Sequence, residues 1–162
     1  MRITHLFSLS LFIVMMTTTA CEKESCNCLE QIDYLVFGQF AGECMGEQCI
    51  EIFKLTDAAL FEDTQDKYPS NQAPYEGTFV ALPSTTFDEV ADLINQVPAA
   101  LLDEPNGTIG MPDAGDWGGY YVEVRRDGNI QFWLIDTMKD NIPEFLHDFN
   151  DKIKAAITTI NE

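Results

Sequence analysis

Five runs of apolar residues along the chain have the length and alternation of β-strands. They cover Gln31–Ala41, Gln48–Leu55, Ala58–Phe61, Tyr120–Val124 and Ile130–Ile135. In the first run, Tyr34, Val36 and Phe40 face one side of a pleated strand and Leu35 and Phe37 face the other, so this strand is predicted to be buried on both faces. Short turns separate the first three runs, and likewise the last two, and such turns join antiparallel neighbours.

Turn and loop signals lie between the apolar runs. Asp127-Gly128 separates the last two runs and is typical of a two-residue hairpin turn. Residues 62–76 are polar and contain two prolines, which predicts a loop, and the short apolar run 78–82 after it is a candidate for one further strand. Residues 103–119 hold five glycines and two prolines and predict a longer irregular loop.

Two segments have the apolar spacing of helices. In residues 86–97, Thr86 and Glu89 occupy the positions of a capping box. The second helix is predicted to begin at Asp140 or Asn141, with a proline in its first turn. Its apolar stripe consists of Leu146, Phe149, Ile153, Ala156, Ile157 and Ile160. We therefore predict an α+β fold in which an antiparallel sheet of about five strands has two helices packed on one face, a two-layer sandwich.

The first twenty residues form a segment of a different kind. They contain Arg2, no acidic residue and the apolar stretch Leu6–Met16, which is too short to cross a bilayer and is typical of a signal peptide. Small residues then lead directly into Cys21. This pattern resembles the lipobox of bacterial lipoproteins, with Thr18 at the position where that family usually has Leu.

The resemblance implies a lipid-anchored protein. The signal peptide (1–20) would be removed, the thiol of Cys21 would carry a diacylglyceryl group, and the new amino terminus would be acylated, for example with palmitate. A leader (21–30) would then connect this membrane anchor to a single domain (31–162). The acidic start Glu22-Lys23-Glu24 resembles the signals that send some Bacteroidota lipoproteins to the cell surface. We expect an outer-membrane location facing the periplasm or the exterior; an ordinary secretory signal is the alternative.

Composition and charge limit the functions that the chain can have. Its 162 residues are 46% hydrophobic, which suits one folded domain and argues against a disordered acidic tail. Lys and Arg total 9 against 27 Asp and Glu, giving a formal net charge of −18. Such a surface repels phosphate backbones, so no nucleic acid is expected as a partner. Loss of the signal peptide would leave His147 as the only histidine, which excludes a multi-histidine zinc centre.

Four further cysteines are Cys26, Cys28, Cys44 and Cys49. Their even number in an exported chain favours disulfides. Cys44 and Cys49 flank a glycine-containing loop between two predicted strands, so we expect this pair to form a disulfide across the neck of the hairpin. Two alternatives remain: a four-thiolate metal site, or a flexible tether in which Cys26 and Cys28 have no structural role.

Residues 110–119 are the most site-like stretch of the sequence. Asp113 and Asp116 lie three apart among glycines with Trp117 beside them, and Asp136 ends a predicted strand. Carboxylates and loop carbonyls are ligands that calcium prefers, so these three acids are a candidate calcium site, although the EF-hand spacing is absent. The alternative is a turn-rich loop whose Asp side chains accept hydrogen bonds from local backbone amides.

Other side chains suggest binding more than catalysis. Trp117 and Tyr120, with Tyr121 and Trp133, are candidates for a binding patch, of which two or more are expected in the core. His147 is expected on a solvated helix face in contact with Asp151.

The pair Arg125-Arg126 could bind an acidic partner, but one of the two is expected to lie over the sheet and the other to pair with surface acids. We predict a non-catalytic envelope module that binds an unknown protein or small ligand through residues 103–119, or alternatively a small carboxylate-dependent or calcium-assisted hydrolase.

Overall fold

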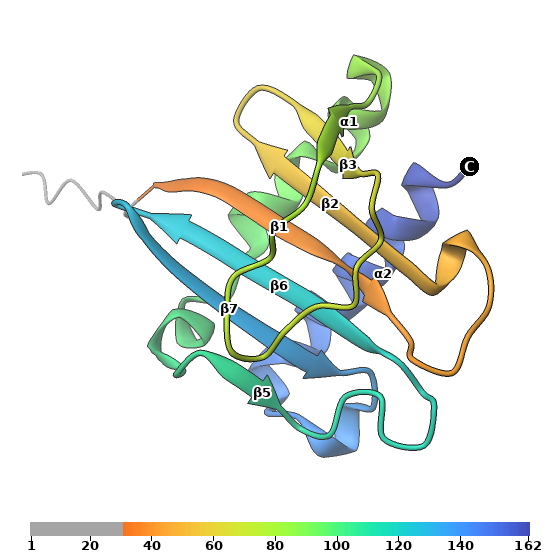
Figure 1. The fold of residues 1–162 in the computed structure, drawn as a ribbon. Helices are drawn as coiled ribbons and strands as arrows, with labels where there is room; N and C mark the ends of the chain where they lie inside the picture. The colour runs from red at the N-terminus through yellow and green to blue at the C-terminus, as the bar shows by residue number, and fades with distance from the viewer. Residues whose placement is uncertain (1–30) are drawn as a thin grey trace, which may run out of the picture.

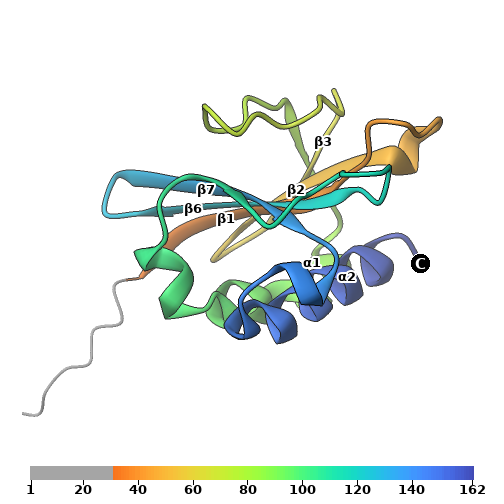
Figure 2. The same ribbon diagram turned by 90° about the horizontal axis from the view of Figure 1, so that it is seen from below.

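The structure is a computed structural model and describes residues 31–162. The predicted signal peptide, Cys21, Cys26 and Cys28 lie outside the described residues. Figure 1 shows one twisted sheet with helices behind it, and Figure 2, turned by 90°, shows that α1 and α2 lie on the same face of that sheet. The predicted α+β class and the placement of both helices on one face are confirmed. Within residues 31–162, no helix combines the length and the apolar character that a membrane span requires.

The sheet has seven strands in the order β4-β3-β2-β1-β6-β7-β5. Their bounds are β1 Ile32–Phe40, β2 Ile50–Thr56, β3 Leu60–Asp63, β4 Phe79–Ala81, β5 Gly107–Ile109, β6 Gly119–Arg126 and β7 Asn129–Asp136. Every neighbouring pair is antiparallel except β5 and β7, which are parallel. The predicted Asp127-Gly128 hairpin is confirmed, and both turn residues have positive φ (52° and 79°), as a type I′ turn requires.

The prediction of about five strands in a purely antiparallel sheet was wrong, because the sheet has more strands and one parallel pair, whereas the candidate strand in residues 78–82 is present as β4. The edge strands β4 and β5 have three residues each, too few for an alternating pattern to stand out. Strand β5 lies inside the segment predicted to be an irregular loop. The chain crosses beneath the whole sheet, from the β4 edge to the β5 edge, before it forms β5, and a long crossover of this kind permits a parallel pairing.

Apolar residues fill both faces of the sheet. On the helix face, Leu35 and Phe37 belong to a core that includes Trp133, Leu146 and Phe149. A second cluster on the opposite face contains Val36, Phe40, Ile52, Tyr121, Phe132 and Leu134. The predicted burial of the first strand on both faces, with the same division of side chains, is therefore confirmed.

The first helical segment begins earlier than its predicted cap. Helix α1 spans Ser84–Val90 and continues as two 3-10 helices, η2 at Ala91–Gln96 and η3 at Ala99–Asp103. The carbonyl of Pro83 accepts the first hydrogen bond of α1, from the N–H of Phe87, so Thr86 lies inside the helix and the predicted capping box was wrong.

Helix α2 spans His147–Ile160, preceded by the 3-10 helices η4 (Lys139–Asn141) and η5 (Glu144–Leu146). The Asn141 side chain, predicted to cap this helix, instead donates a hydrogen bond to Asp136.

Residues 64–78 cross the face of the sheet opposite the helices, as Figures 1 and 2 show, and are called the strap below. This segment falls largely in the predicted polar loop. The first and last residues of the strap are hydrogen-bonded to each other, because the N–H of Thr64 donates to the carbonyl of Thr78. At its far point, Asn71 donates to the Thr108 hydroxyl of β5. The strap therefore reaches from one edge of the sheet to the other and covers the second apolar cluster.

Candidate functional site

Three loops meet at the end of the sheet where β1 ends. Residues 41–49 connect β1 to β2 and include the short 3-10 helix η1 (Glu47–Cys49), residues 110–118 connect β5 to β6, and residues 137–141 follow β7. The strand register places them together, because Phe40 pairs with both Ile50 and Gly119, and Gly119 also pairs with Asp136. We call these three loops the tip (Figure 1). The chain enters β1 at the opposite end of the sheet.

Asp113 connects the tip loops to each other and to the strap. Its Oδ2 accepts hydrogen bonds from the N–H of Gly42 (2.8 Å) and from the hydroxyl of Tyr68 (2.9 Å). Its Oδ1 accepts a third, from the N–H of Gly118 (3.1 Å). One carboxylate therefore joins the loops 41–49 and 110–118 to the strap. Only the bond from Gly118 is to a local backbone amide, the kind of contact that the sequence suggested as an alternative to calcium binding.

A disulfide closes the first tip loop. Cys44 and Cys49 are bonded, with their Cα atoms 5.5 Å apart, so the predicted pairing is confirmed. Next to it, the N–H of Ala41 donates to the carbonyl of Cys49 (2.8 Å) and continues the β1–β2 ladder by one bond. The loop is thus held at its neck by a covalent and a hydrogen bond.

Large apolar side chains are exposed mainly at the tip. Among the residues described, six such side chains are exposed, and only Val80, on β4, lies away from the tip. The others are Met45, Tyr68, Met111, Trp117 and Met138. Met45 is fully exposed and Trp117 is 69% exposed. Tyr68 belongs to the strap, but its ring packs edge-on against Phe40 (5.0 Å) and its hydroxyl reaches Asp113, so it borders the tip.

The same loops are rich in acidic residues. They contain Glu43, Glu47, Asp113, Asp116 and Asp140. Their only basic residue is Lys139. The Lys139 ammonium lies 2.6 Å from the carboxylate of Asp151 on α2, so its charge is balanced outside the tip. The tip therefore combines exposed apolar side chains with acidic neighbours.

The four aromatic residues predicted as a binding patch have separate locations. Trp117 is exposed at the tip, but Tyr120, the other candidate for ligand binding, is 92% buried against the helix layer and so takes no part in an exposed patch. Trp133 lies in the same core and donates its indole N–H to the carbonyl of Pro105. Tyr121 is buried on the opposite face. Alternation along β6 explains the division, because Tyr120 and Tyr121 must point to opposite faces.

Asp136, the third predicted calcium ligand, is surrounded by its own hydrogen-bond donors. Its carboxylate accepts bonds from the N–H of Met111 (2.9 Å), the N–H of Met138 (2.8 Å) and the amide of Asn141 (2.8 Å). Burial raises the pKa of this carboxyl, but the hydrogen bonds outweigh burial and hold the pKa below its ordinary value.

Asp116 is exposed in the loop, whereas Asp113 and Asp136 use their oxygens for structural hydrogen bonds. Within residues 31–162, no group of three or more Asp, Glu, His or Cys side chains is arranged to hold a metal ion. The calcium hypothesis stays a prediction.

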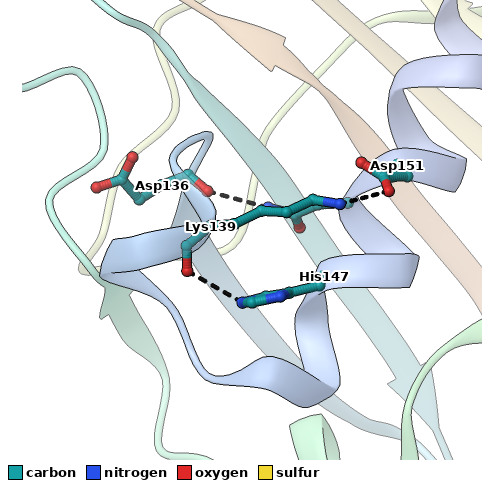
Figure 3. Close-up of polar contacts among 5 residues, drawn as sticks. Asp136, Lys139, His147 and Asp151 are labelled. Atoms are coloured by element: carbon teal, nitrogen blue, oxygen red, sulfur yellow. Dashed lines mark hydrogen bonds and ion pairs between the residues drawn. The ribbon is translucent and has the colours of Figure 1, made fainter.

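His147 lies at the start of α2, beside the tip, as Figure 3 shows. Its Nε2 is 3.0 Å from the carbonyl oxygen of Lys139 and 3.3 Å from that of Ile142, so Nε2 carries the proton and donates. Asp151, its predicted partner, instead accepts from Lys139. The expected contact between His147 and Asp151 was therefore wrong. The histidine fixes the backbone before the helix, where helix capping by a side chain is otherwise lacking.

Arg125 combines the two roles expected for the arginine pair. Its Nε is 3.7 Å from the carboxylate of Asp33, and its guanidinium lies 6.0 Å from the centroid of the Tyr34 ring.

Arg126 lines a cleft of about 790 Å³ at the end of the sheet opposite the tip. Partly buried apolar side chains such as Ile32, Phe87 and Leu102 form much of its wall.

Sequence reasoning missed two buried carboxylates that hold the strap. Glu123 accepts hydrogen bonds from the hydroxyls of Tyr34 (3.0 Å) and Tyr121 (2.7 Å) and from the N–H of Tyr75 (2.8 Å). Asp63 accepts one from the Tyr75 hydroxyl (2.7 Å). Both acids are 98% buried. The alternation along β6 places Glu123 on the same face as Tyr121, which is the one signal that could have indicated a buried acid.

Comparison of the chain with protein-family models, with curated protein sequences and with solved structures gives no match.

Proposed function

We propose that this protein is a lipid-anchored, non-catalytic binding module of the cell envelope that presents its tip to a partner protein. The observation that carries the proposal is the concentration of exposed apolar side chains on the three tip loops and on Tyr68. Exposed apolar groups that gather on one surface are typical of interaction sites, whereas isolated ones are ordinary.

The orientation of β1 supports this proposal. The lipobox-like signal would place the lipid at Cys21, and the chain from there reaches β1 at the end of the sheet away from the tip. Nine residues of β1 extend about 30 Å at the usual rise per residue. The domain would therefore hold the tip away from the membrane, where a partner can reach it.

A hydrolase is less well supported by the described residues. Catalysis by paired carboxylates needs acids that are free to exchange protons with a substrate. The acids predicted for that role are Asp113 or Asp116, acting with Asp136. Asp113 and Asp136 have both of their oxygens bonded to backbone or side-chain donors, and Asp116 is exposed in the loop. The tip has the features of a surface that binds rather than reacts.

Site-specific photo-crosslinking in the native host tests the proposal. A photoreactive residue in place of Met111 should give a discrete crosslinked species, whereas one in place of exposed Asp88, on α1 and outside the tip, should not. Mass spectrometry of the same protein should show acylation at Cys21. Equal crosslinking from both positions would contradict the role of the tip, and an unmodified Cys21 would contradict the anchor.

A further inference from the structure

The exposed apolar side chains of the tip each have an acidic residue close by in the sequence. Glu43 precedes Met45 by two residues, Asp116 directly precedes Trp117, and Asp140 follows Met138 by two. All three acids are exposed. They stand on three different loops, so the pairing of an apolar group with a carboxylate recurs across the tip.

Methionine supplies three of the five exposed apolar side chains at and beside the tip. Its unbranched, polarisable side chain adapts to partner side chains of different shape, and it is common on surfaces that bind apolar segments. Trp117 adds a rigid aromatic face that can take an aliphatic side chain or the cation of Lys or Arg. The disulfide and the three hydrogen bonds to Asp113 hold two of the loops that carry these groups.

The charges determine which kind of partner fits. The tip loops hold five acidic residues, and their single base, Lys139, is paired with Asp151. The strap, which borders the tip through Tyr68, adds a single base of its own, Lys67. Acidic partners, anionic lipid and nucleic acid would be repelled, whereas a partner with Lys or Arg would be attracted and oriented.

We propose that the tip binds an amphipathic protein segment in which Lys or Arg alternates with large apolar side chains. This inference rests on the proposed function and names its partner class. The apolar groups of the segment would contact Met45, Met111 and Trp117, and its basic groups would meet Glu43 and Asp116. Apolar contact would supply most of the affinity, and charge would supply the selectivity.

Peptide binding to the full chain tests this inference. The protein is captured on a biosensor surface, free detergent is washed away, and three twelve-residue peptides are passed over it at about 150 mM salt, where exposed charges are screened beyond about 8 Å. The peptides alternate Lys with Leu, Glu with Leu, or Lys with Ser. The Lys–Leu peptide should bind at least about tenfold more tightly than either of the others, a difference of about 1.4 kcal/mol.

Matched variants separate the tip from the rest of the acidic surface. Trp117→Ala should weaken binding of the Lys–Leu peptide about tenfold, the effect of losing one aromatic anchor, whereas Val80→Ala, which truncates the exposed apolar residue away from the tip, should leave it within about twofold. Glu43→Gln with Asp116→Asn should weaken it about fivefold more than Asp57→Asn with Asp88→Asn, which removes the same charge elsewhere.

Equal effects of the two charge variants would overturn the inference, because attraction would then come from the whole surface. Equal binding of the Glu–Leu and Lys–Leu peptides would overturn the choice of a basic partner while leaving the proposed binding function intact. Trp117-dependent binding of vesicles of phosphatidylcholine and phosphatidylglycerol would overturn it in favour of a lipid surface. Failure of the proposed function is distinguishable, since it would appear as a lack of tip-specific crosslinks.

Discussion

At the scale of single residues, Asp113 connects the segments that form and border the tip. Its backbone has a φ of 58°, in the left-handed region that Asp and Asn adopt more readily than other residues with side chains. Its two oxygens accept three hydrogen bonds, one from Gly118 in its own loop and two from distant segments, Gly42 in the first tip loop and Tyr68 in the strap. The position therefore requires both the backbone freedom and the acceptors of a short polar residue.

Replacement of Asp113 tests this dual requirement. Asp113→Ala should lower the free energy of unfolding by about 1–3 kcal/mol, because hydrogen bonds to a charged acceptor are lost and the left-handed backbone becomes strained. Asp113→Asn should lower it less, because one oxygen and the backbone preference remain. Urea denaturation measures both values. Asp88→Ala, on the exposed side of α1, is the control and should change stability by less than about 0.5 kcal/mol.

All five tyrosines hold their protons more tightly than usual. Burial, followed by the negative charge of an acidic neighbour and the hydrogen bond to it, raises the pKa of Tyr34 and of Tyr68 from 10.0 to about 12. For Tyr34 the neighbour is Glu123, and for Tyr68 it is Asp113. Burial also raises the pKa of Tyr75, Tyr120 and Tyr121 above the ordinary value.

The fold should therefore lose stability at alkaline pH. Each tyrosine keeps its proton to higher pH in the folded chain than in the unfolded chain, so its stabilising contribution is complete below pH 10 and declines as the pH rises from about 10 to 12. Absorbance at 295 nm, recorded together with circular dichroism, should show tyrosine ionising only as the fold is lost. Ionisation near pH 10 with an unchanged circular dichroism spectrum would contradict this expectation.

At the scale of elements, the strap is the segment whose position depends most on tertiary contacts. Its polar sequence has no helical or strand periodicity of its own, and it is held by buried acids on β3 and β6. The ring of Tyr75 packs against that of Tyr121 (5.7 Å between centroids), and its hydroxyl both donates to Asp63 and accepts from the N–H of Lys67. Tyr75 is thus the main attachment of the strap to the sheet.

Tyr75→Phe should loosen the strap without unfolding the sheet. A hydrogen bond to a charged acceptor contributes about 1.5–3 kcal/mol, which corresponds to roughly a 10- to 100-fold larger population of the opened strap. Trypsin cleavage after Lys67 should accelerate by a similar factor. Tyr120→Phe removes a hydroxyl from the helix side of the sheet and should leave this cleavage rate unchanged. Equal acceleration in both variants would indicate global unfolding instead.

The disulfide at the tip should have a moderate effect on stability. Cross-linking residues five apart removes conformational freedom from the unfolded chain, a gain of about 2 kcal/mol for so short a ring. Replacing Cys44 and Cys49 together by Ser should therefore lower the free energy of unfolding by about that amount in urea denaturation. Reducing agent should lower the stability of the unmodified protein equally and should have no effect on the double variant.

Periodicity and turn chemistry were sufficient to predict much of the sheet. The apolar alternation of β1, the Asp127-Gly128 turn and the helical stripe of α2 are local signals, and the structure follows them. The short strand β4 was indicated only as a candidate by the apolar run 78–82, and β5 carries no such signal, because three residues do not define a period. Helix beginnings were mispredicted because Pro83 supplies the first acceptor of α1 and because Asn141 is engaged by Asp136.

The candidate site could be predicted only in part. The glycines and acids of residues 110–119 indicated a structured loop and Trp117 was one of four aromatic candidates for a binding patch, and the cysteine spacing indicated the disulfide. Met45, Tyr68 and Met138 come to the tip from other segments, through strand register and through the hydrogen bonds to Asp113. Nothing local in the sequence links them, because only the pairing order of the strands sets which loops become neighbours.

At the scale of the whole molecule, excess negative charge opposes folding. A formal net charge of −18 in a chain of this size produces self-repulsion in the compact state. Raising NaCl from about 20 to 500 mM should therefore raise the melting temperature by about 2–5 °C. CaCl2 at matched ionic strength should give the same rise, because Asp113 and Asp136 already accept structural hydrogen bonds. A calcium-specific rise that Asp113→Asn with Asp116→Asn abolishes would support the calcium hypothesis.

The central place of β1 has a consequence for how the domain would bear a mechanical load. This strand is hydrogen-bonded to β2 on one side and to β6 on the other along nearly its whole length, and its first residue is where the proposed lipid-anchored leader would join the sheet. If a partner pulls on the tip while the chain is held at Ile32, the first residue of β1, the force acts parallel to the strands. Both ladders are then strained in shear, so their hydrogen bonds must break together rather than one after another, and the protein would resist extension along this axis.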